Sequence, residues 1–286
     1  MVIHALSFDV EEWYDGNLHR DWVLEAAREM PGRLASEWER ILNLLSRQEV
    51  RATFFILGRA AQRLPELVRA TAAEGHEIAS HGFDHQLVHR QPPADFASDV
   101  ERTRKLLQDL SGQPVWGFRA PSWSLRRSHE AYLLGVSRAG HLYSSSIFPM
   151  RTPLYGDSTA PITPYRHELP GLSSLLEIPP AVSRWGPLRL PYGGGVYWRL
   201  WPASATTALL RRASKPQVTY LHPWELNPVP APMPPGLPWL ARFVLTHGLA
   251  GSFRRLQDLL SAIPFTRIDR VYSDQIRPRW DADCWR

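Results

Sequence analysis

Short apolar segments alternate with longer amphipathic ones, and this alternation is regular over the first half of the chain. Residues 2–8 are mostly apolar and run directly into Asp9 and Glu11, a pattern typical of a buried strand that ends in carboxylates. Residues 36–48 carry apolar side chains at helical spacing, which predicts an amphipathic helix. The same reasoning predicts strands at 52–57, 77–80, 115–119 and 142–143, and helices at 64–73, 94–110 and 127–139.

The second half of the chain begins with an interruption of this pattern. Residues 149–202 are rich in Pro, Gly and Ser and predict a long excursion with some β structure. A helix at 203–212 and a strand at 217–221 then resume the alternation, and a last helix is predicted at 252–262. The proline-rich run 228–238 cannot be helical, because proline lacks the N–H donor and fixes φ.

Polar residues with catalytic chemistry follow the predicted strands. Asp9 and Glu11 follow the first strand, Arg119 ends another, and His222 comes directly after the strand that precedes it. In a barrel of alternating parallel strands and helices, the carboxyl ends of the strands meet at one face, where the active site lies. The sequence therefore predicts an α/β barrel, formed by residues 1–286 as a single domain with a Pro/Gly-rich insertion.

The charge of the chain limits the classes of partner. A formal net charge of +5 and a pI near 9.6 favour anionic partners such as nucleic acid, acidic glycans or lipid phosphates. No run of five or more Lys or Arg occurs, so the charge pattern of a nucleic-acid-binding protein is missing. We therefore expect no nucleic-acid partner. The single cysteine, Cys284, excludes an internal disulfide.

The sequence also predicts the cellular location of the protein. No segment reaches the roughly 18 consecutive apolar residues that span a bilayer, and the N-terminus lacks the basic region and apolar stretch of a signal peptide. We expect a cytoplasmic protein that can contact the inner membrane surface. Residues 228–240, with Trp239 and Phe243 beside basic residues, are the candidate for this peripheral contact, and a plain covering loop is the alternative. The sequence does not predict an oligomeric state.

Two histidines four residues apart, His81 and His85, follow a predicted short strand. One turn of helix or a tight loop can direct both imidazoles toward a single ion. A divalent ion would also need an anionic oxygen ligand, and Asp9, Glu11 and Glu12 are the candidates. Along an extended strand Asp9 and Glu11 point to one face and Glu12 to the other. The common alternative for such an acidic cluster is a solvated loop or helix start.

Four motifs occur in a fixed order along the chain. They are Phe8-Asp9-Val10-Glu11-Glu12-Trp13, Ser80-His81-Gly82-Phe83-Asp84-His85, Phe118-Arg119-Ala120-Pro121-Ser122-Trp123 and Leu221-His222-Pro223-Trp224-Glu225. Together they resemble the successive motifs of the polysaccharide deacetylases, the NodB-like carbohydrate esterase family 4, in its exosortase-associated branch. The resemblance extends from residue 5 to about residue 270. It implies a distorted (β/α)7-type barrel.

The resemblance also implies a role for each matched residue. Asp9 stands at the position of the general base, Arg119 at that of the arginine which orients this base, and His222 at that of the general acid. The backbone N–H of Ser122 would help to bind the oxyanion, and Trp123 would form a wall of the sugar groove. The implied metal ligands are Glu11, His81 and His85.

Other tryptophans are candidates for contact with sugar rings. Trp224, Trp13 and Trp198 could stack on a sugar face, although aromatic side chains more often serve packing.

These roles imply hydrolysis of an N-acetyl group on a glycan or a lipid-linked saccharide. The implied cofactor is a divalent metal cation, with zinc as the expected ion and cobalt, nickel or manganese as alternatives. A basic cytoplasmic deacetylase would suit a lipid-phosphate-linked substrate. Two other functions stay open, namely amide hydrolysis of a small cyclic ureide or imide, and glycan binding by a catalytically inactive relative.

The chain departs from the family pattern at two points. The family opening has two adjacent aspartates, and a valine replaces the second of them, so the carboxylate ligand is assigned to Glu11 with Glu12 as the alternative. The family aspartate that tunes the acid histidine is replaced by serines at 144–146. Glu177 and Glu225 are the candidates for that tuning role.

Overall fold

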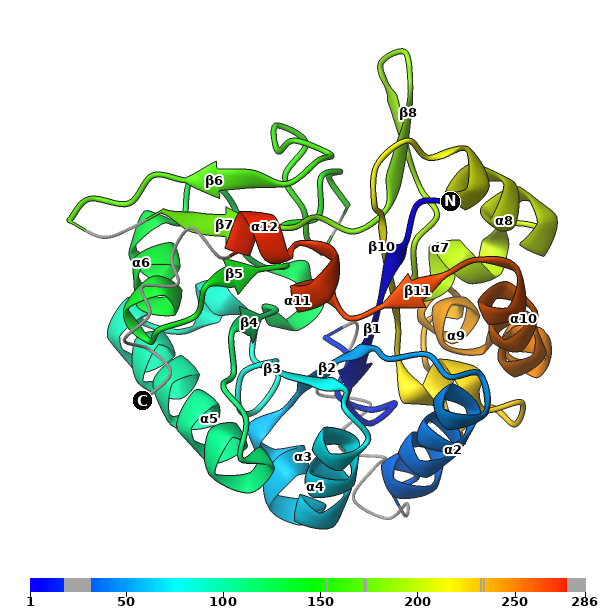
Figure 1. Cartoon of the computed structure of the whole chain (residues 1–286), viewed down its shortest axis with the longest axis horizontal. Coiled ribbons are helices and arrows are strands. Elements are labelled where there is room, and N and C mark those ends of the chain that lie inside the picture. Colours follow the sequence, from blue (N-terminus) through cyan, green and yellow to red (C-terminus); the bar gives the residue numbers. More distant parts are fainter. Residues whose placement is uncertain (18–31, 153, 172–173, 232, 234, 277–286) are drawn as a thin grey trace.

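The centre of the molecule is a curved, mainly parallel sheet (Figure 1). The computed structural model describes residues 1–17, 32–152, 154–171, 174–231, 233 and 235–276, so Cys284 lies outside the described residues. The strands of the sheet are β1 His4–Val10, β2 Thr53–Ile56, β3 Glu77–Ser80, β4 Gly117–Phe118, β5 Tyr143–Ser144, β6 Tyr165–His167, β7 Leu175–Glu177, β10 Val218–Leu221 and β11 Phe265–Thr266.

Within the described residues, seven strands run parallel in the order β10, β1, β2, β3, β4, β5, β7. β6 pairs antiparallel with β7 at one edge, and β11 is a further parallel strand that pairs with the N-terminal end of β1. This arrangement confirms the (β/α)7-type barrel that the resemblance implies. Because all seven strands point the same way, their carboxyl ends gather the residues that follow them at one face.

β1 lies between β2 and β10 in the sheet, and all of its residues are buried. Phe8 is in register with Phe54 of β2 on one side and with Leu221 of β10 on the other. A parallel strand with neighbours on both sides and elements over both faces has no solvated side, which explains its mostly apolar sequence. β1 therefore fixes Asp9 and the adjoining Glu11 at the carboxyl end of the sheet.

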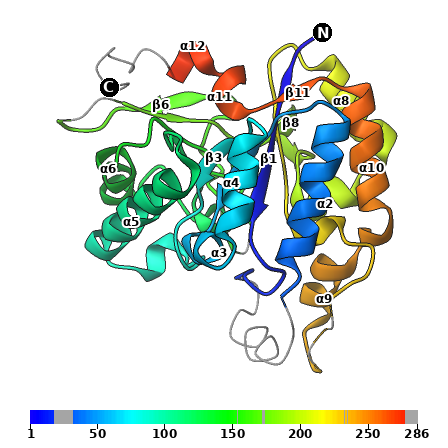
Figure 2. The same ribbon diagram turned by 60° about the horizontal axis from the view of Figure 1, so that its bottom comes forward.

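Helices surround the sheet on its outer side (Figures 1 and 2). They are α2 Leu34–Arg47, α3 Gly58–Arg63, α4 Pro65–Ala73, α5 Pro93–Ser111, α6 Glu130–Arg138, α7 Gly195–Leu200, α8 Ala203–Arg212, α9 Trp239–Thr246, α10 Leu249–Ala262, α11 Ile268–Val271 and α12 Ser273–Ile276. α2 buries Trp38, Ile41 and Leu45 on one face, at the spacing that places side chains on the same side of a helix. Its Trp38 ring stacks on Phe54 of the sheet, with 6.3 Å between ring centroids. None of the helices in the described ranges is both long and apolar enough to span a membrane.

The Pro/Gly-rich excursion at 149–202 contains β structure, as its sequence predicts. One part of it forms β7, which pairs in parallel with β5 and so joins the central sheet. A second part forms the hairpin of β8 Val182–Trp185 and β9 Leu188–Pro191, which projects at the top of Figure 1. The excursion thus supplies the strand β7 and the antiparallel edge strand β6 of the central sheet, and one protruding hairpin.

His141, between α6 and β5, is fully buried beside the Phe118 ring. Burial, together with the charge of Arg104, lowers the pKa of this imidazole from 6.5 to about 3. A histidine with a depressed pKa stabilises the fold above its unfolded-state pKa of 6.5, and the stabilisation is lost as the pH falls toward 3. At pH 5 the loss from one such group amounts to about 2 kcal/mol.

We therefore expect the free energy of unfolding to fall less steeply between pH 7.5 and pH 5 in His141→Leu than in the unmodified chain. Urea unfolding at several pH values measures the two slopes. The comparison uses the slope because the substitution also changes packing. His89→Asn, at an exposed position, is the matched control. Equal slopes for His141→Leu and the unmodified chain would contradict the prediction.

Candidate active site

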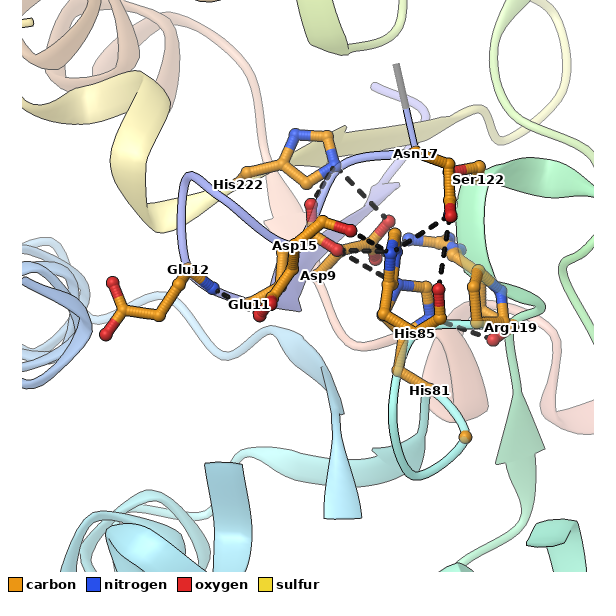
Figure 3. A network of polar contacts seen from close by, with 12 residues as sticks. Asp9, Glu11, Glu12, Asp15, Asn17, His81, His85, Arg119, Ser122 and His222 are labelled. Atoms are coloured by element: carbon orange, nitrogen blue, oxygen red, sulfur yellow. Dashed lines mark hydrogen bonds and ion pairs between the residues drawn. The ribbon is translucent and has the colours of Figure 1, made fainter. Parts of the chain in front are cut away.

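The carboxyl ends of the strands meet around one pocket, whose polar residues are drawn in Figure 3. Arg119 lies behind Asp9, completely buried. The other residues to which the resemblance assigns a role, together with Trp224, line the pocket, namely Asp9, Glu11, His81, His85, Ser122, Trp123, His222 and Trp224. The fold therefore brings together the residues of all four motifs.

Three ligand atoms converge at one point of this pocket. Glu11 Oε2 lies 2.6 Å from His85 Nε2 and 3.7 Å from His81 Nε2, and the ligand atoms of all three residues lie within 4.8 Å of one another. All three side chains are buried. Two imidazoles and one carboxylate are a ligand set that suits zinc and related divalent ions and leaves further positions open.

The Nδ1 atoms of both histidines already have hydrogen-bond partners. His81 Nδ1 lies 2.8 Å from the carbonyl oxygen of Arg119, and His85 Nδ1 lies 2.6 Å from that of Asp15. A carbonyl oxygen only accepts hydrogen bonds, so each Nδ1 carries a proton, and in the neutral ring each Nε2 presents a lone pair. Lone pairs of both rings then face the Glu11 carboxylate. A cation between them relieves this repulsion, and the donor set therefore fits a metal ion.

Glu12 points away from the ligand cluster (Figure 3). Its Oε1 lies 2.6 Å from Arg63 Nη2, and its Oε2 accepts the backbone N–H of Arg33 at 3.0 Å. Both carboxylate oxygens thus have partners outside the pocket. The geometry favours Glu11 over Glu12 as the carboxylate ligand, in agreement with the strand alternation that the sequence predicts.

Asp9 is held from behind by Arg119. Arg119 Nη1 lies 2.5 Å from Asp9 Oδ1 and also donates to Ser7 Oγ at 3.0 Å. The other two guanidinium nitrogens donate to the carbonyl oxygen and the hydroxyl of Ser145. With every nitrogen of its planar fork engaged, the arginine has one orientation and imposes one on Asp9. The second carboxylate oxygen, Asp9 Oδ2, lies 3.9 Å from His222 Nε2.

His222 lies next to Asp9 and Glu11 and is paired with Glu225. Its Nδ1 lies 2.8 Å from Glu225 Oε2, and Glu225 Oε1 accepts from Arg199 Nε at 2.8 Å. Burial lowers the pKa of His222, but the carboxylates of Glu225, Glu11 and Asp9 outweigh this effect and raise it to about 9. The imidazole is therefore protonated at neutral pH and can donate a proton.

Of the two glutamates considered for tuning His222, the geometry selects Glu225. Glu177 instead accepts the backbone N–H groups of Ser146 and Ile147 at 2.7 and 2.8 Å. The hydroxyl of Ser146 in turn accepts the backbone N–H of Ala120. Glu177 thus shapes the loop after β5 whose Ser145 holds Arg119, and it contacts the acid histidine nowhere in the described structure.

Arg199 and Asn17 are site residues that the sequence reasoning missed. Arg199, on α7, binds Glu225, and Asn17 Nδ2 donates to Ser122 Oγ at 2.9 Å and to the carbonyl oxygen of His85 at 3.2 Å. Neither residue belongs to a motif with a recognisable spacing. Only the folded chain brings them to the site.

The backbone around the pocket holds unusual conformations. His85, Ser122 and Trp123 have φ values of 55°, 50° and 52°, in the left-handed region that non-glycine residues rarely adopt. Such conformations concentrate at functional sites, where the surrounding structure imposes them. At Ser122 the unusual turn and the contact with Asn17 fix the loop at the pocket edge. The role of its N–H in binding an oxyanion stays a prediction.

The aromatic walls of the pocket are partly as the sequence predicts. Trp224 stacks on the His222 ring, with 5.5 Å between centroids and an interplanar angle of 21°. Trp123 lines the pocket but packs edge-on against Tyr220 at 4.9 Å. Trp198 is fully buried beneath Arg255, so the prediction that it could stack on a sugar is wrong.

Comparisons with known protein families match two adjacent parts of the chain. Residues 29–138 match the polysaccharide deacetylase family, and residues 145–273 match a domain of unknown function (DUF3473). In the structure both parts contribute strands to the same sheet.

Two curated relatives are similar over short segments. The chain is 35% identical over 81 residues to the peptidoglycan-N-acetylglucosamine deacetylase of Listeria monocytogenes, which is 28% of this chain and 17% of that protein. It is 40% identical over 75 residues to the chitooligosaccharide deacetylase of a Bradyrhizobium species, which is 26% of this chain and 34% of that protein. The matches thus span about a third or less of these relatives' length.

Solved structures share the fold over nearly the whole chain. A protein from Mycobacterium smegmatis described as a polysaccharide deacetylase is 18% identical, with a TM-score of 0.61 over 97% of this chain and 91% of that one. A family 4 carbohydrate esterase from Streptomyces lividans is 16% identical, with a TM-score of 0.51 over 93% and 91%. A pseudoenzyme of the same family from Bacillus anthracis is 12% identical, with a TM-score of 0.51 over 94% and 64%. At these identities the likeness concerns the fold alone.

Proposed function

Because the chain belongs to the polysaccharide deacetylase family, we propose that it hydrolyses the N-acetyl group of a saccharide with the help of a divalent metal ion. The observation that carries this proposal is the placement of two polar pairs around one ligand cluster. Asp9, bound by Arg119, and His222, bound by Glu225, both lie beside the cluster formed by Glu11, His81 and His85, with His222 Nε2 3.9 Å from Asp9 Oδ2 and 3.7 Å from Glu11 Oε1. Amide hydrolysis needs a base and an acid within reach of the scissile bond.

The ligand cluster would hold the metal through Glu11 and the Nε2 atoms of His81 and His85. A bound divalent ion lowers the pKa of water and polarises a carbonyl oxygen, which is the chemistry it would supply here. Zinc is the ion proposed first, since tetrahedral N/O sites with an open position are typical of catalytic zinc. The carbonyl oxygens of Arg119 and Asp15 keep the histidine rings in place, and Asn17 donates to the backbone carbonyl of His85.

Each of the two polar pairs would carry out one of the two proton transfers. Asp9 Oδ2 is the carboxylate oxygen left free by Arg119, and it would accept the proton of the attacking water. His222 Nε2 lies 3.9 Å from Asp9 Oδ2 and would donate a proton to the leaving amine. Glu225 holds the Nδ1–H of His222 at 2.8 Å, which keeps Nε2 directed into the pocket. Trp224 and Trp123 would flank the sugar.

A cyclic ureide or imide hydrolase and an inactive glycan-binding relative are the competing functions. The complete acid and base pairs argue against an inactive relative, because binding alone needs neither an acid nor a base.

Acetate release from N-acetylated chitooligosaccharides and peptidoglycan fragments tests the proposal directly, with zinc, cobalt, nickel or manganese added to the chelated protein. We expect metal-dependent acetate release. Turnover of cyclic ureides instead, or no release with any metal-loaded sample, would overturn the proposed function.

Glu225→Gln is expected to lower kcat by about 10²-fold, with little change in KM or metal content. The amide keeps a hydrogen-bond acceptor for Arg199 but removes the charge that stabilises the His222 imidazolium. The matched control is Glu77→Gln, since Glu77 is also a buried carboxylate with hydrogen-bond donors but lies at the opposite end of β3. Steady-state kinetics of both variants measures the effect. A similar loss in the control would show that burial of a glutamate, rather than its pairing with His222, is what matters.

A further inference from the structure

Helix α9 lies at the rim of the candidate active site (Figure 2). Its inner side belongs to the protein core, where Ala241 and the preceding Leu237 pack against Trp13. Val244 and Leu245 line the pocket itself. Packing in the core and at the pocket thus explains the apolar residues on the inner side of α9.

The outer side of α9 is apolar and exposed. Trp239, Leu240 and Phe243 are 78%, 48% and 37% exposed. Arg242 and Thr246 are the only polar residues of this eight-residue helix. Exposed helices of soluble proteins normally turn a polar face to water, so clustered exposed apolar side chains indicate a binding surface. We call Trp239, Leu240 and Phe243 the α9 face.

The chain segment that contains the α9 face carries only positive charges. Residues 228–257 contain three arginines and no acidic residue. Arg242 lies exposed within α9, and Arg254 lies exposed on the following helix α10. Basic residues beside exposed aromatic and aliphatic ones are the combination that binds anionic lipid surfaces, because the ring and chain enter the headgroup region while arginines attract its phosphates.

We propose that the α9 face docks on an anionic lipid bilayer, with Trp239, Leu240 and Phe243 entering the interfacial layer and Arg242 contacting lipid phosphates. The size of the face supports a membrane over a second copy of the chain. At exposures of 78%, 48% and 37%, three side chains of at most about 250 Å² each present far less than the ~800 Å² per partner that a stable protein interface buries. Trp at a membrane interface gains from having both an apolar ring and a polar N–H.

Docking in this way would bring the pocket to the membrane surface. α9 is tied directly to the acid side of the site, because Arg199 binds Glu225 and also donates to the backbone carbonyl of Val244 at 2.7 Å. α9 thus lies directly beside the pocket, so docking of its outer side would hold the pocket next to the bilayer. A substrate whose saccharide is attached to a lipid would then reach the pocket from the bilayer. The docking itself does not depend on the proposed function, since it is measured without substrate.

Co-sedimentation of the whole chain with vesicles tests the docking. Vesicles of phosphatidylcholine with phosphatidylglycerol are compared with vesicles of phosphatidylcholine alone, and binding is expected only with the anionic ones. Trp239→Ala/Phe243→Ala is expected to weaken binding by at least about tenfold, and Arg242→Glu to weaken it as well. The matched control is Trp185→Ala/Leu188→Ala, since these residues are 62% and 55% exposed on the hairpin that projects elsewhere (Figure 1).

Several outcomes would overturn the proposal. They are absence of binding to anionic vesicles, equal binding to both kinds of vesicle, and equal loss in the α9 and hairpin variants. A mass in solution that corresponds to a dimer and returns to a monomer in Trp239→Ala/Phe243→Ala would show instead that the face joins two copies. Unfolding midpoints of all variants establish that each is folded when binding is measured.

Discussion

Replacement of Asp9 by asparagine is expected to abolish nearly all turnover, with kcat lowered by about 10²–10⁴-fold. The amide has the size of the carboxylate and keeps an oxygen for Arg119, but it cannot accept the proton of a water molecule. Because Asp9 lies outside the three-residue ligand cluster, metal content should stay that of the unmodified protein. Single-turnover acetate release and elemental analysis of the same samples measure the two quantities.

Two other results would contradict the role proposed for Asp9. Loss of metal together with activity would make Asp9 a ligand, and near-normal turnover would remove it from the mechanism. Ser7→Ala provides a neighbouring control, because Ser7 Oγ also accepts from Arg119 Nη1, at 3.0 Å, yet it carries no charge. We expect that variant to retain most activity.

Glu11→Gln is the second substitution with a large expected effect, and its primary readout is metal binding rather than turnover. Removal of the anionic ligand should weaken zinc binding by more than about 100-fold, since even residues that only support metal ligands contribute 10- to 100-fold. Competition with a chromophoric chelator measures this affinity. Anomalous scattering from crystals soaked in zinc should place the ion between Glu11, His81 and His85.

The adjacent carboxylate offers a matched control for this experiment. Glu12→Gln alters a buried glutamate one residue away, whose oxygens contact Arg63 and the Arg33 backbone, and it should leave zinc affinity unchanged. If Glu12→Gln weakened binding and Glu11→Gln did not, the assignment of the ligand would be reversed.

Local sequence patterns predict most of the candidate site, because the parallel strands of the barrel all end at one face. Asp9, His81, Arg119 and His222 each come at or directly after a strand, and parallel strands place such residues at one face whatever their distance along the chain. The alternation of side chains past the end of β1 also separates Glu11 from Glu12. Glu225 could be predicted from the sequence because it follows His222 by three residues, which is one turn of the 3-10 helix after β10.

The partners that hold these residues were not predictable in the same way. Arg199 lies on a six-residue helix, and Asn17 lies in a loop, so no period or spacing connects either to the site. α9 was missed because it follows a proline-rich run and has apolar residues on both sides, which erases the amphipathic pattern that sequence analysis depends on. β7, with three residues, is too short to show an alternation.

The position of β1 between β2 and β10 has a consequence for the order in which the molecule can form during synthesis. Phe8 of β1 pairs with Leu221 of β10, so one neighbour of the first strand is made some two hundred residues later. At a ribosomal rate of 5–20 residues per second this delay is roughly 10 to 40 s, during which β1 can pair with β2 but keeps its other edge open. An unpaired apolar edge is a template for aggregation. Nascent chains of this topology therefore depend on that edge being shielded until the second half of the barrel emerges.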